Sequence, residues 1–384
     1  MNRKHNNTAK DKLETRIIKN IEAFRKLEAE WNQLVREENY DITLLHQWQI
    51  TWWEIFRQER ELYIITVRDN KKLIGIAPFL KRRVHYFKSI PINRIEFIAS
   101  GEDERDEICS EYLDFICSRA NREDVIKAVS DLLIKNKNEW DEILLTDIKN
   151  NSENLKTFTQ NMTLKNIKHE QNSEAQCPYI ELTENWEDLK KRNRINSREQ
   201  LNRKKRRLEK LGNIEYRTIE SKNISKDIFN QYISLHQARW NAEGKNGSFS
   251  SDLFHSFHLK LLERLKPLSA PVLYFLLLDN QAIAARYCFS FNNILYDYLP
   301  GLDPSLDRKL SHGFINLAQS IEQSIESKHK RFDFFKGKTG SYKYKWTDCS
   351  QKVSRHRYIK NSLTFLVINI LENIKHYLKT IKSG

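Results

Sequence analysis

Residues 62–77 read Leu-Tyr-Ile-Ile-Thr-Val-Arg-Asp-Asn-Lys-Lys-Leu-Ile-Gly-Ile-Ala, and residues 273–285 read Leu-Tyr-Phe-Leu-Leu-Leu-Asp-Asn-Gln-Ala-Ile-Ala-Ala. Each stretch is a β-rich run, an Asp-Asn pair and a second β-rich run. Asp and Asn tolerate the left-handed backbone of a tight turn, so each stretch predicts a β-hairpin. An aromatic, helical segment precedes each hairpin, at 44–60 and at 229–265, and another strand and a helix follow. This internal similarity predicts two copies of one α/β unit.

Composition and charge limit the classes of protein that the chain can be. It has 384 residues, more than one hydrophobic core usually holds, so we expect two domains. Hydrophobic residues make up 39% and aromatic residues 11%, which excludes a largely disordered chain. The formal charge of +14 favours an anionic partner, such as a phosphate, a nucleic acid or a membrane surface.

The sequence predicts a cytoplasmic protein without a metal. The longest apolar run, residues 272–278, is far shorter than the roughly 20 residues of a membrane-spanning helix. The polar N-terminus lacks the apolar stretch of a signal peptide. The five scattered cysteines include no CxxC pair, which fits neither a disulfide framework nor a zinc site. His255 and His258 have no carboxylate or thiol partner at ligand spacing.

Hydrophobic periodicity places the remaining elements. Apolar residues at helical spacing predict helices at 23–36 and 122–136, and β-rich runs predict strands at 94–100 and 142–148. Residues 150–177 are polar and rich in asparagine, so we expect the boundary between the units there. In the second unit we expect strands at 294–299, 331–335 and 353–359 and a helix at 313–327.

Several short motifs, taken together, carry a family resemblance. In the first unit these are Glu30-Trp31, Trp48, Trp52-Trp53 and Gly-Ile-Ala-Pro at 75–78. In the second unit they are Leu-His-Gln-Ala-Arg-Trp at 235–240, Gly-Ser-Phe at 247–249, Gly-Leu-Asp-Pro at 301–304, Ser-His-Gly at 311–313, Phe-Asp-Phe-Phe-Lys-Gly at 332–337 and Tyr-Lys-Tyr-Lys-Trp at 342–346. The chain resembles the acetyltransferase-like proteins of the GNAT superfamily in the cellulose-biosynthesis (CelD/BcsL) group, which is related to Fem-type peptidyltransferases.

The resemblance implies a fold class, α+β or α/β, with tandem GNAT-like domains that each hold a mixed central sheet flanked by helices. It divides the chain into a polar tail at 1–20, an N-terminal GNAT-like domain at 21–170, a C-terminal GNAT-like domain at 171–360 and an amphipathic helix at 361–384. The C-terminal domain would bind the donor and hold the catalytic site. The implied co-substrate is acetyl-CoA or another acyl-CoA.

The expected donor site lies where the strand at 294–299 leads to the helix at 313–327. Unpaired amides and the dipole at a helix N-terminus attract anions, so the diphosphate of the carrier would lie there. An ordinary capped helix is the alternative, and the segment lacks the Gln/Arg-x-x-Gly-x-Gly/Ala signature of ordinary GNAT enzymes. The residues expected to contact the donor are Arg308, Lys309, Ser311, His312 and Gly313.

His236 is one of two candidates for the general base. It stands three residues before Arg239 on a predicted helix, so both side chains reach one face. Histidine can take the proton that an amine must lose before it attacks a thioester, and arginine can hold an anion of the acceptor. His236 and Trp240 are alternatively packing residues. Trp240, Tyr342 and Trp346 are the aromatic residues expected at the substrate site.

Asp333 is the second candidate base. Phe332 and Phe334 point to one face of the predicted strand and Asp333 to the other. A carboxylate in apolar surroundings has a raised pKa or an ion-pair partner, here Lys343 or Arg239. By motif, Lys343 corresponds to a lysine that Fem-type enzymes use near the developing charge, where it would stabilise the oxyanion.

Residues 190–210 form the most basic segment of the chain. They hold eleven Lys and Arg against Glu199 and Glu209. This segment has three alternative interpretations: a solvated surface, a binding surface for CoA phosphates or a polyanionic acceptor, or a contact surface for transfer RNA. It has no aromatic residues, so a contact with RNA would be directed at the backbone and sensitive to salt.

The C-terminal helix has one apolar side. Leu363, Leu366, Ile370 and Ile374 share that side, with Lys375, Lys379 and Lys382 nearby. Such a helix either packs on its own domain or makes a peripheral contact with an anionic membrane.

These observations give three functional hypotheses. The first is an acyl-CoA-dependent N-acyltransferase, in its simplest form an acetyltransferase, acting on a small-molecule or sugar amine. Only the resemblance suggests a place in cell-surface polysaccharide biosynthesis. The second is a Fem-like transferase that uses aminoacyl-tRNA, and the third is a non-catalytic binding protein with the GNAT fold. The chain has no GxSxG, P-loop or dinucleotide fingerprint, which argues against hydrolases, kinases and dehydrogenases.

Overall fold

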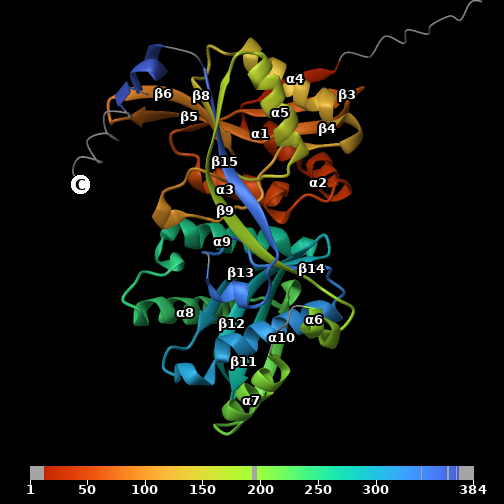
Figure 1. Cartoon of the computed structure of the whole chain (residues 1–384), viewed down its shortest axis with the longest axis vertical. Helices are drawn as coiled ribbons and strands as arrows, with labels where there is room; N and C mark the ends of the chain where they lie inside the picture. The colour runs from red at the N-terminus through yellow and green to blue at the C-terminus, as the bar shows by residue number, and fades with distance from the viewer. Residues whose placement is uncertain (1–12, 193–196, 339, 361–362, 369, 372–384) are drawn as a thin grey trace, which may run out of the picture.

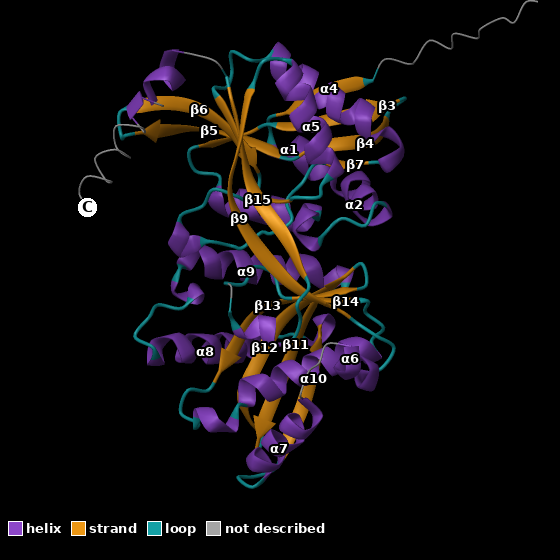
Figure 2. Ribbon diagram, viewed as in Figure 1, coloured by secondary structure: helices purple, strands orange, loops and turns teal. Residues whose placement is uncertain are grey.

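The computed structural model describes residues 13–192, 197–338, 340–360, 363–368 and 370–371. They form two α/β units that lie one above the other, joined by two long strands (Figures 1 and 2). Residues 13–165 are called the N-terminal unit and residues 182–349 the C-terminal unit. The two long strands, β9 (Lys168–Glu181) and β15 (Ser350–Ile359), are called the connecting ribbon.

The N-terminal unit contains the first predicted hairpin. Strands β3 (Ile64–Asp69) and β4 (Lys72–Ala77) pair antiparallel, and Asn70 and Lys71 have positive φ angles at the turn. The helix predicted at 23–36 is divided at Leu27. The other elements are β1 (Glu14–Ile18), α1 (Ile21–Lys26), α2 (Glu28–Glu37), α3 (His46–Phe56), β2 (Arg60–Leu62), β5 (Phe79–Tyr86), β6 (Ile90–Phe97), β7 (Ile116–Cys117), α4 (Arg122–Lys135), β8 (Glu142–Lys149) and α5 (Glu153–Leu164).

The C-terminal unit contains the second predicted hairpin. Strands β11 (Pro271–Leu278) and β12 (Gln281–Phe291) pair antiparallel, and Asp279 and Asn280 both have positive φ angles. Both predicted hairpins therefore form; the second turns at its Asp-Asn pair, whereas the turn of the first is shifted by one residue to Asn70 and Lys71. The other elements are α6 (Trp186–Arg192), α7 (Ser197–Glu209), β10 (Ile214–Glu220), α8 (Lys226–Ala242), α9 (Asp252–Leu265), β13 (Ile294–Leu302), α10 (His312–Glu326) and β14 (Arg331–Asp333).

The first strand of the connecting ribbon lies in the stretch where the sequence predicts the boundary between the units. Residues 150–177 fold into α5 and most of β9. β9 pairs with β14 at one end and with β15 along its length, and β15 also pairs with β8. Polar residues suit β9 because much of the strand is exposed to solvent, while its backbone groups form hydrogen bonds with β15. Within the described residues, the ribbon joins both units into one sheet of eleven strands, in the order β10-β11-β12-β13-β14-β9-β15-β8-β6-β5-β2.

Each unit has a parallel strand pair followed by an opening. β6 runs parallel to β8, with α4 between them in the chain, and β13 runs parallel to β14, with α10 between them. Because β14 ends at Asp333 while β13 continues to Leu302, the two strands part beyond Tyr296. The candidate site described below lies beside this opening.

The largest hydrophobic cluster extends across both units. Trp48 of α3 packs edge to face against Phe257, Phe289 and Tyr298 of the C-terminal unit. Arg264 of α9 also forms a salt bridge with Glu54 of α3 at 2.9 Å. The units are therefore held against each other by apolar and ionic contacts as well as by the ribbon.

The C-terminal segment packs through a different side from the one grouped in the sequence. Phe365 and Ile368 are buried in a small cluster with Ile92 and Ile359. Leu363, Leu366 and Ile370 are exposed, and Ile374 and the three lysines lie outside the described residues. No helix in the described ranges is long and apolar enough to cross a membrane.

Candidate functional site

A cavity of about 580 Å³ lies in the C-terminal unit, beside the part of β13 that has left β14. We call it cavity A. Its walls come from α7, α8, the end of β13, the start of α10 and the segment at 342–346. Seven residues named from the sequence line it: Arg239, Arg308, Ser311, His312, Gly313, Tyr342 and Trp346.

The start of α10 presents unpaired amides to cavity A. Ser311 has a left-handed backbone, and its carbonyl accepts the amides of Phe314 and Ile315. Within the described residues, the amides of His312 and Gly313 donate no hydrogen bond. Ser311 occupies the N-cap position without a side-chain cap, and its hydroxyl accepts a hydrogen bond from Lys204 Nζ at 2.6 Å. Two donors at the positive end of the helix dipole thus remain for a ligand.

Gly313 brings α10 close to β13. A Cβ atom at this position would lie 2.8 Å from Cδ2 of Leu302. The glycine therefore permits close packing between the helix and the strand at the wall of cavity A.

The wall of cavity A is cationic. Five Lys and Arg side chains line it against the carboxylates of Asp303 and Glu243. Lys204 comes from the basic segment 190–210, and Lys309, although predicted, does not line the cavity. An excess of positive charge next to free amides suits a phosphorylated ligand. The five cations are Lys204, Arg239, Arg286, Arg308 and Lys345.

Apolar surface completes the cavity. Trp346 is buried and stacks on Phe314, with ring centroids 4.9 Å apart. Tyr342 is partly exposed, and its ring lies 6.0 Å from the guanidinium of Arg286. The aromatic wall expected from the sequence is present next to the cationic residues.

His236 lies behind the wall of cavity A, not in it. Its Nδ1 is 3.0 Å from the carbonyl oxygen of Pro300, a lining residue, and its ring packs on Phe249. Nε2 has no hydrogen-bond partner within the described residues. Burial lowers the pKa of His236 to about 4, so the imidazole is neutral at pH 7. Trp240 also lies outside the lining, under the Arg239 guanidinium.

Asp333 accepts hydrogen bonds from a residue of the N-terminal unit. The Tyr112 hydroxyl contacts both carboxylate oxygens, at 3.0 and 2.9 Å, and the Phe335 amide donates to Oδ1. The expected partners, Lys343 and Arg239, do not fill this position. Burial raises the pKa of Asp333 to about 6. Because its strand alternates, Asp333 faces the contact between the units and does not line cavity A.

Lys343 forms hydrogen bonds with the backbone of the neighbouring segment 334–336. Its Nζ donates to the carbonyl oxygens of Phe334 and Lys336, both at 2.5 Å. Burial lowers the pKa of Lys343. The ammonium therefore points away from cavity A, although its neighbour Tyr342 lines it.

Two polar residues near the site were not predicted. Arg286 is buried and pairs with Asp297 at 2.5 Å; a lone arginine in the apolar strand β12 was the available signal. Glu111 is buried at the contact between the units, and its Oε2 lacks a partner within the described residues. Burial raises the pKa of Glu111 to about 8. Nothing in its local sequence distinguishes it.

Metal ligands are not grouped in the described part of the chain: no set of three His, Cys, Asp or Glu side chains is placed to hold an ion. His258 instead contacts the Tyr298 hydroxyl at 3.0 Å.

Comparisons with known proteins concern the family of the C-terminal unit and the fold of the whole chain. Residues 196–345 match the family model described as acetyltransferase (GNAT) domain. The structure of FemX aligns with 92% of this chain and 99% of its own, at a TM-score of 0.60 and 11% identity. The structure of L-PGS from Bacillus licheniformis aligns with 90% of this chain and 96% of its own, at a TM-score of 0.50 and 13% identity. No curated protein sequence matches the chain.

At these identities the likeness concerns the fold. The chain has a mixed α+β fold of tandem GNAT-like units, as the resemblance implies. The finer resemblance to the cellulose-biosynthesis group stays a prediction. The segment that matches the GNAT domain model contains almost all the walls of cavity A, and the chain as a whole has a fold similar to that of FemX.

Proposed function

We propose that the chain is an acyl-CoA-dependent N-acyltransferase, and that it transfers an acetyl group to an amine of a small molecule or sugar. One observation carries the proposal: the two unpaired amides of His312 and Gly313 open into a cationic cavity within the segment that matches the GNAT domain. A place in cell-surface polysaccharide biosynthesis belongs to the same proposal and rests on the resemblance alone.

The residues of cavity A fit the parts of a CoA thioester. The amides at the start of α10 would hold the diphosphate, and Lys204, Arg308 and Lys345 would balance its charge. The surface of Trp346 and Leu302 would cover the apolar arm. When bound, the thioester supplies the acyl group.

Transfer requires that the acceptor amine lose a proton and that the oxyanion be stabilised. Asp333 and Glu111, with pKa values raised to about 6 and about 8, are the stronger bases near the contact between the units. His236, with a pKa lowered to about 4, is a weaker one. The roles of these residues, and that of Lys343 toward the oxyanion, stay predictions.

Calorimetry with acetyl-CoA and with desulfo-CoA tests the donor. The wild-type chain should bind both in the micromolar range, because the diphosphate contacts do not involve sulfur. Lys204→Ala should weaken binding about tenfold, which corresponds to a loss of about 1.4 kcal/mol of binding free energy. Arg203→Ala, an exposed neighbour on α7 outside the lining, is the matched control and should change affinity less than about twofold. Absence of binding at millimolar donor would contradict the proposal.

A second candidate is a Fem-like transferase that uses aminoacyl-tRNA. The observation in its favour is the exposed row of Arg203, Arg206 and Arg207 on α7. Binding of transfer RNA that falls steeply between 50 and 200 mM salt, roughly as counterion release requires, would support it. Donor binding without turnover on any amine would instead support the non-catalytic hypothesis.

A further inference from the structure

The helical residues 363–368 and 370–371, which lie beside β5 and β6, present an apolar face to solvent (Figure 1). Residues at positions i, i+3, i+4 and i+7 of a helix share one face, and here all four are large and apolar. We call them the apolar stripe, and nothing in the proposed transfer chemistry uses it. Its four side chains are between 47% and 80% exposed: Leu363, Leu366, Val367 and Ile370.

The opposite face of the same helical residues is fixed to the N-terminal unit. Phe365 and Ile368 are buried in a cluster with Ile92 of β6 and Ile359 of β15. The Phe365 ring also packs edge to face against Tyr86 of β5, with ring centroids 6.3 Å apart. Because one face is packed against the sheet, the apolar stripe is held toward solvent.

The apolar stripe concentrates the exposed apolar surface of the chain. Nine large hydrophobic side chains of the described residues are exposed, and four of the nine belong to the stripe. A fifth is Phe87, in the turn between β5 and β6 that follows Tyr86. Single exposed apolar side chains are ordinary, whereas a contiguous row of them marks a contact with a partner or a membrane.

The elements around the apolar stripe contribute cations and no carboxylate. Residues 79–95, which form β5, the turn and most of β6, hold five Lys and Arg and no Asp or Glu. Among them, Lys88 is exposed in the turn. Residues 359–371 also lack an acidic residue, and Lys360 pairs with Asp141 at 3.3 Å. Beyond the described residues, the sequence continues with three lysines and one acidic residue: Lys375, Lys379, Lys382 and Glu372.

We propose that the apolar stripe docks the chain on the surface of a membrane that contains anionic lipids. The stripe would enter the boundary between the headgroups and the acyl chains, and Lys88 would lie at the level of the lipid phosphates. A second copy of this chain fits the face less well, because it would bring the same cations against those of the first copy. Docking does not depend on a donor in cavity A, so the two proposals are separable.

Co-sedimentation of the full-length chain with lipid vesicles tests this inference. The chain should bind vesicles of phosphatidylcholine with roughly one third phosphatidylglycerol, and should bind pure phosphatidylcholine at least about fivefold more weakly. The variant Leu363→Gln/Leu366→Gln/Ile370→Gln changes exposed side chains only. It should bind the anionic vesicles at least about tenfold more weakly, because three apolar side chains no longer leave water on docking.

A matched control separates the apolar stripe from exposed apolar surface in general. Leu164→Gln/Leu211→Gln/Leu253→Gln replaces three leucines of similar exposure elsewhere in the chain and should keep the wild-type affinity within about twofold. Urea titration should give the same midpoint for both triple variants and the wild type, since none of the six side chains is buried.

Four results would overturn the inference. They are absence of binding to the anionic vesicles, equal binding to neutral vesicles, equal affinities of the two triple variants, and sedimentation as a dimer through the stripe in place of vesicle binding. Equal affinities would assign the binding to another basic surface, such as α7. All measurements are made without acetyl-CoA, so failure of the donor proposal leaves their interpretation unchanged.

Discussion

The helices α4 and α10 occupy equivalent places in the two units, each after the first strand of a parallel pair, yet they begin differently. The first turn of α4 contains Glu123 and Asp124, whereas that of α10 contains no acidic residue and follows Arg308. Carboxylates in the first turn offset the helix dipole from within the chain. At the start of α10 no carboxylate of the first turn offsets the helix dipole, so the positive end of the dipole can attract an anionic ligand.

The cavities beside the two parallel strand pairs show the same contrast. Cations outnumber carboxylates in cavity A, whereas carboxylates outnumber cations in the cavity of about 690 Å³ beside β6 and β8. The duplicated fold therefore has an opening in each unit, and a few side chains around the opening decide its charge. Similarity of fold alone does not predict what either unit binds.

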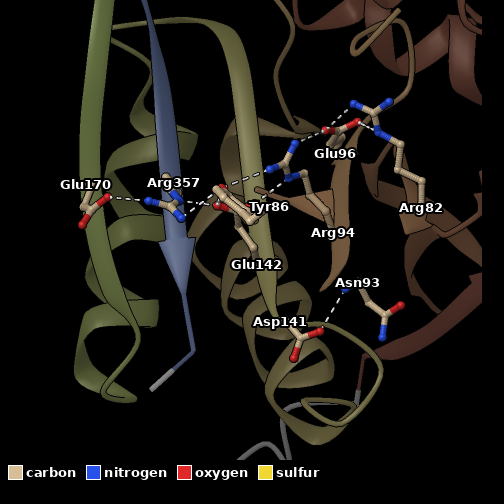
Figure 3. A network of polar contacts seen from close by, with 9 residues as sticks. All are labelled: Arg82, Tyr86, Asn93, Arg94, Glu96, Asp141, Glu142, Glu170 and Arg357. Carbon is tan, nitrogen blue, oxygen red and sulfur yellow. Dashed lines mark hydrogen bonds and ion pairs between the residues drawn. The ribbon is translucent and has the colours of Figure 1, made fainter. Parts of the chain in front are cut away.

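The buried carboxylate Asp297 of the C-terminal unit pairs with Arg286, whereas Glu142 of the N-terminal unit accepts hydrogen bonds from Arg94, Arg357 and Tyr86 (Figure 3). This difference in the number of partners gives the largest expected effect. Arg286→Met leaves the buried Asp297 unpaired and should lower the free energy of unfolding by about 3–5 kcal/mol in urea titrations. Arg94→Met leaves Glu142 with Arg357 and Tyr86, so it should cost only about 2 kcal/mol. Equal losses would contradict the comparison. Arg286→Met/Asp297→Leu, which removes both charges, should recover most of the stability.

Making α10 begin as α4 does should abolish its anion site. His312→Glu places a carboxylate beside the unpaired amides and should weaken acetyl-CoA binding about 100-fold, because like charges at close range cost about 3 kcal/mol. His312→Gln has the same shape without the charge and should stay within about threefold of the wild type. Similar losses in both variants would mean that the imidazole itself matters, not the charge.

The contact between the units should respond to pH through Glu111. Burial raises its pKa to about 8 from an ordinary value of 4.5, so the folded chain keeps a proton that the unfolded chain releases. Stability is therefore fully present below about pH 4.5 and falls as the pH rises toward 8. Glu111→Gln should flatten this slope in urea titrations from pH 5 to pH 8. An unchanged slope would assign the pH dependence to other groups.

The smallest effect is expected at the start of α4. Glu123→Gln removes one favourable charge at the helix N-terminus and should cost about 0.5 kcal/mol of stability. Acetyl-CoA affinity should not change. A measurable change in that affinity would mean that the N-terminal unit takes part in donor binding.

Local patterns predicted most of the secondary structure. The two hairpins, α4, β8 and α10 follow from turn chemistry and periodicity, which depend on neighbours in the chain. At 150–177, where the sequence predicts the boundary between the units, the secondary structure was not predicted, because a ribbon strand exposed to solvent has the composition of a loop. The break at Leu27 between α1 and α2 has no strong sequence signal.

Of the candidate site residues, those at the start of α10 line cavity A, whereas His236, Asp333 and Lys343 do not. Residues at the start of α10 line cavity A because helix termini reach the surface, which the sequence order reveals. His236, Asp333 and Lys343 have suitable chemistry, but partners distant in the chain decide where they point; Tyr112, which contacts Asp333, is more than two hundred positions away. Arg286 and Glu111 depend on the same distant contacts.

The return of β15 to the N-terminal unit has a consequence for synthesis on the ribosome. β8 pairs with β6 on one side, but its other neighbour is made of residues 350–359, near the end of the chain. While the middle of the polypeptide emerges, β8 and β9 present open edges that only the final strand can close. Nascent chains stalled before that strand should therefore be the species most prone to aggregate and to engage chaperones.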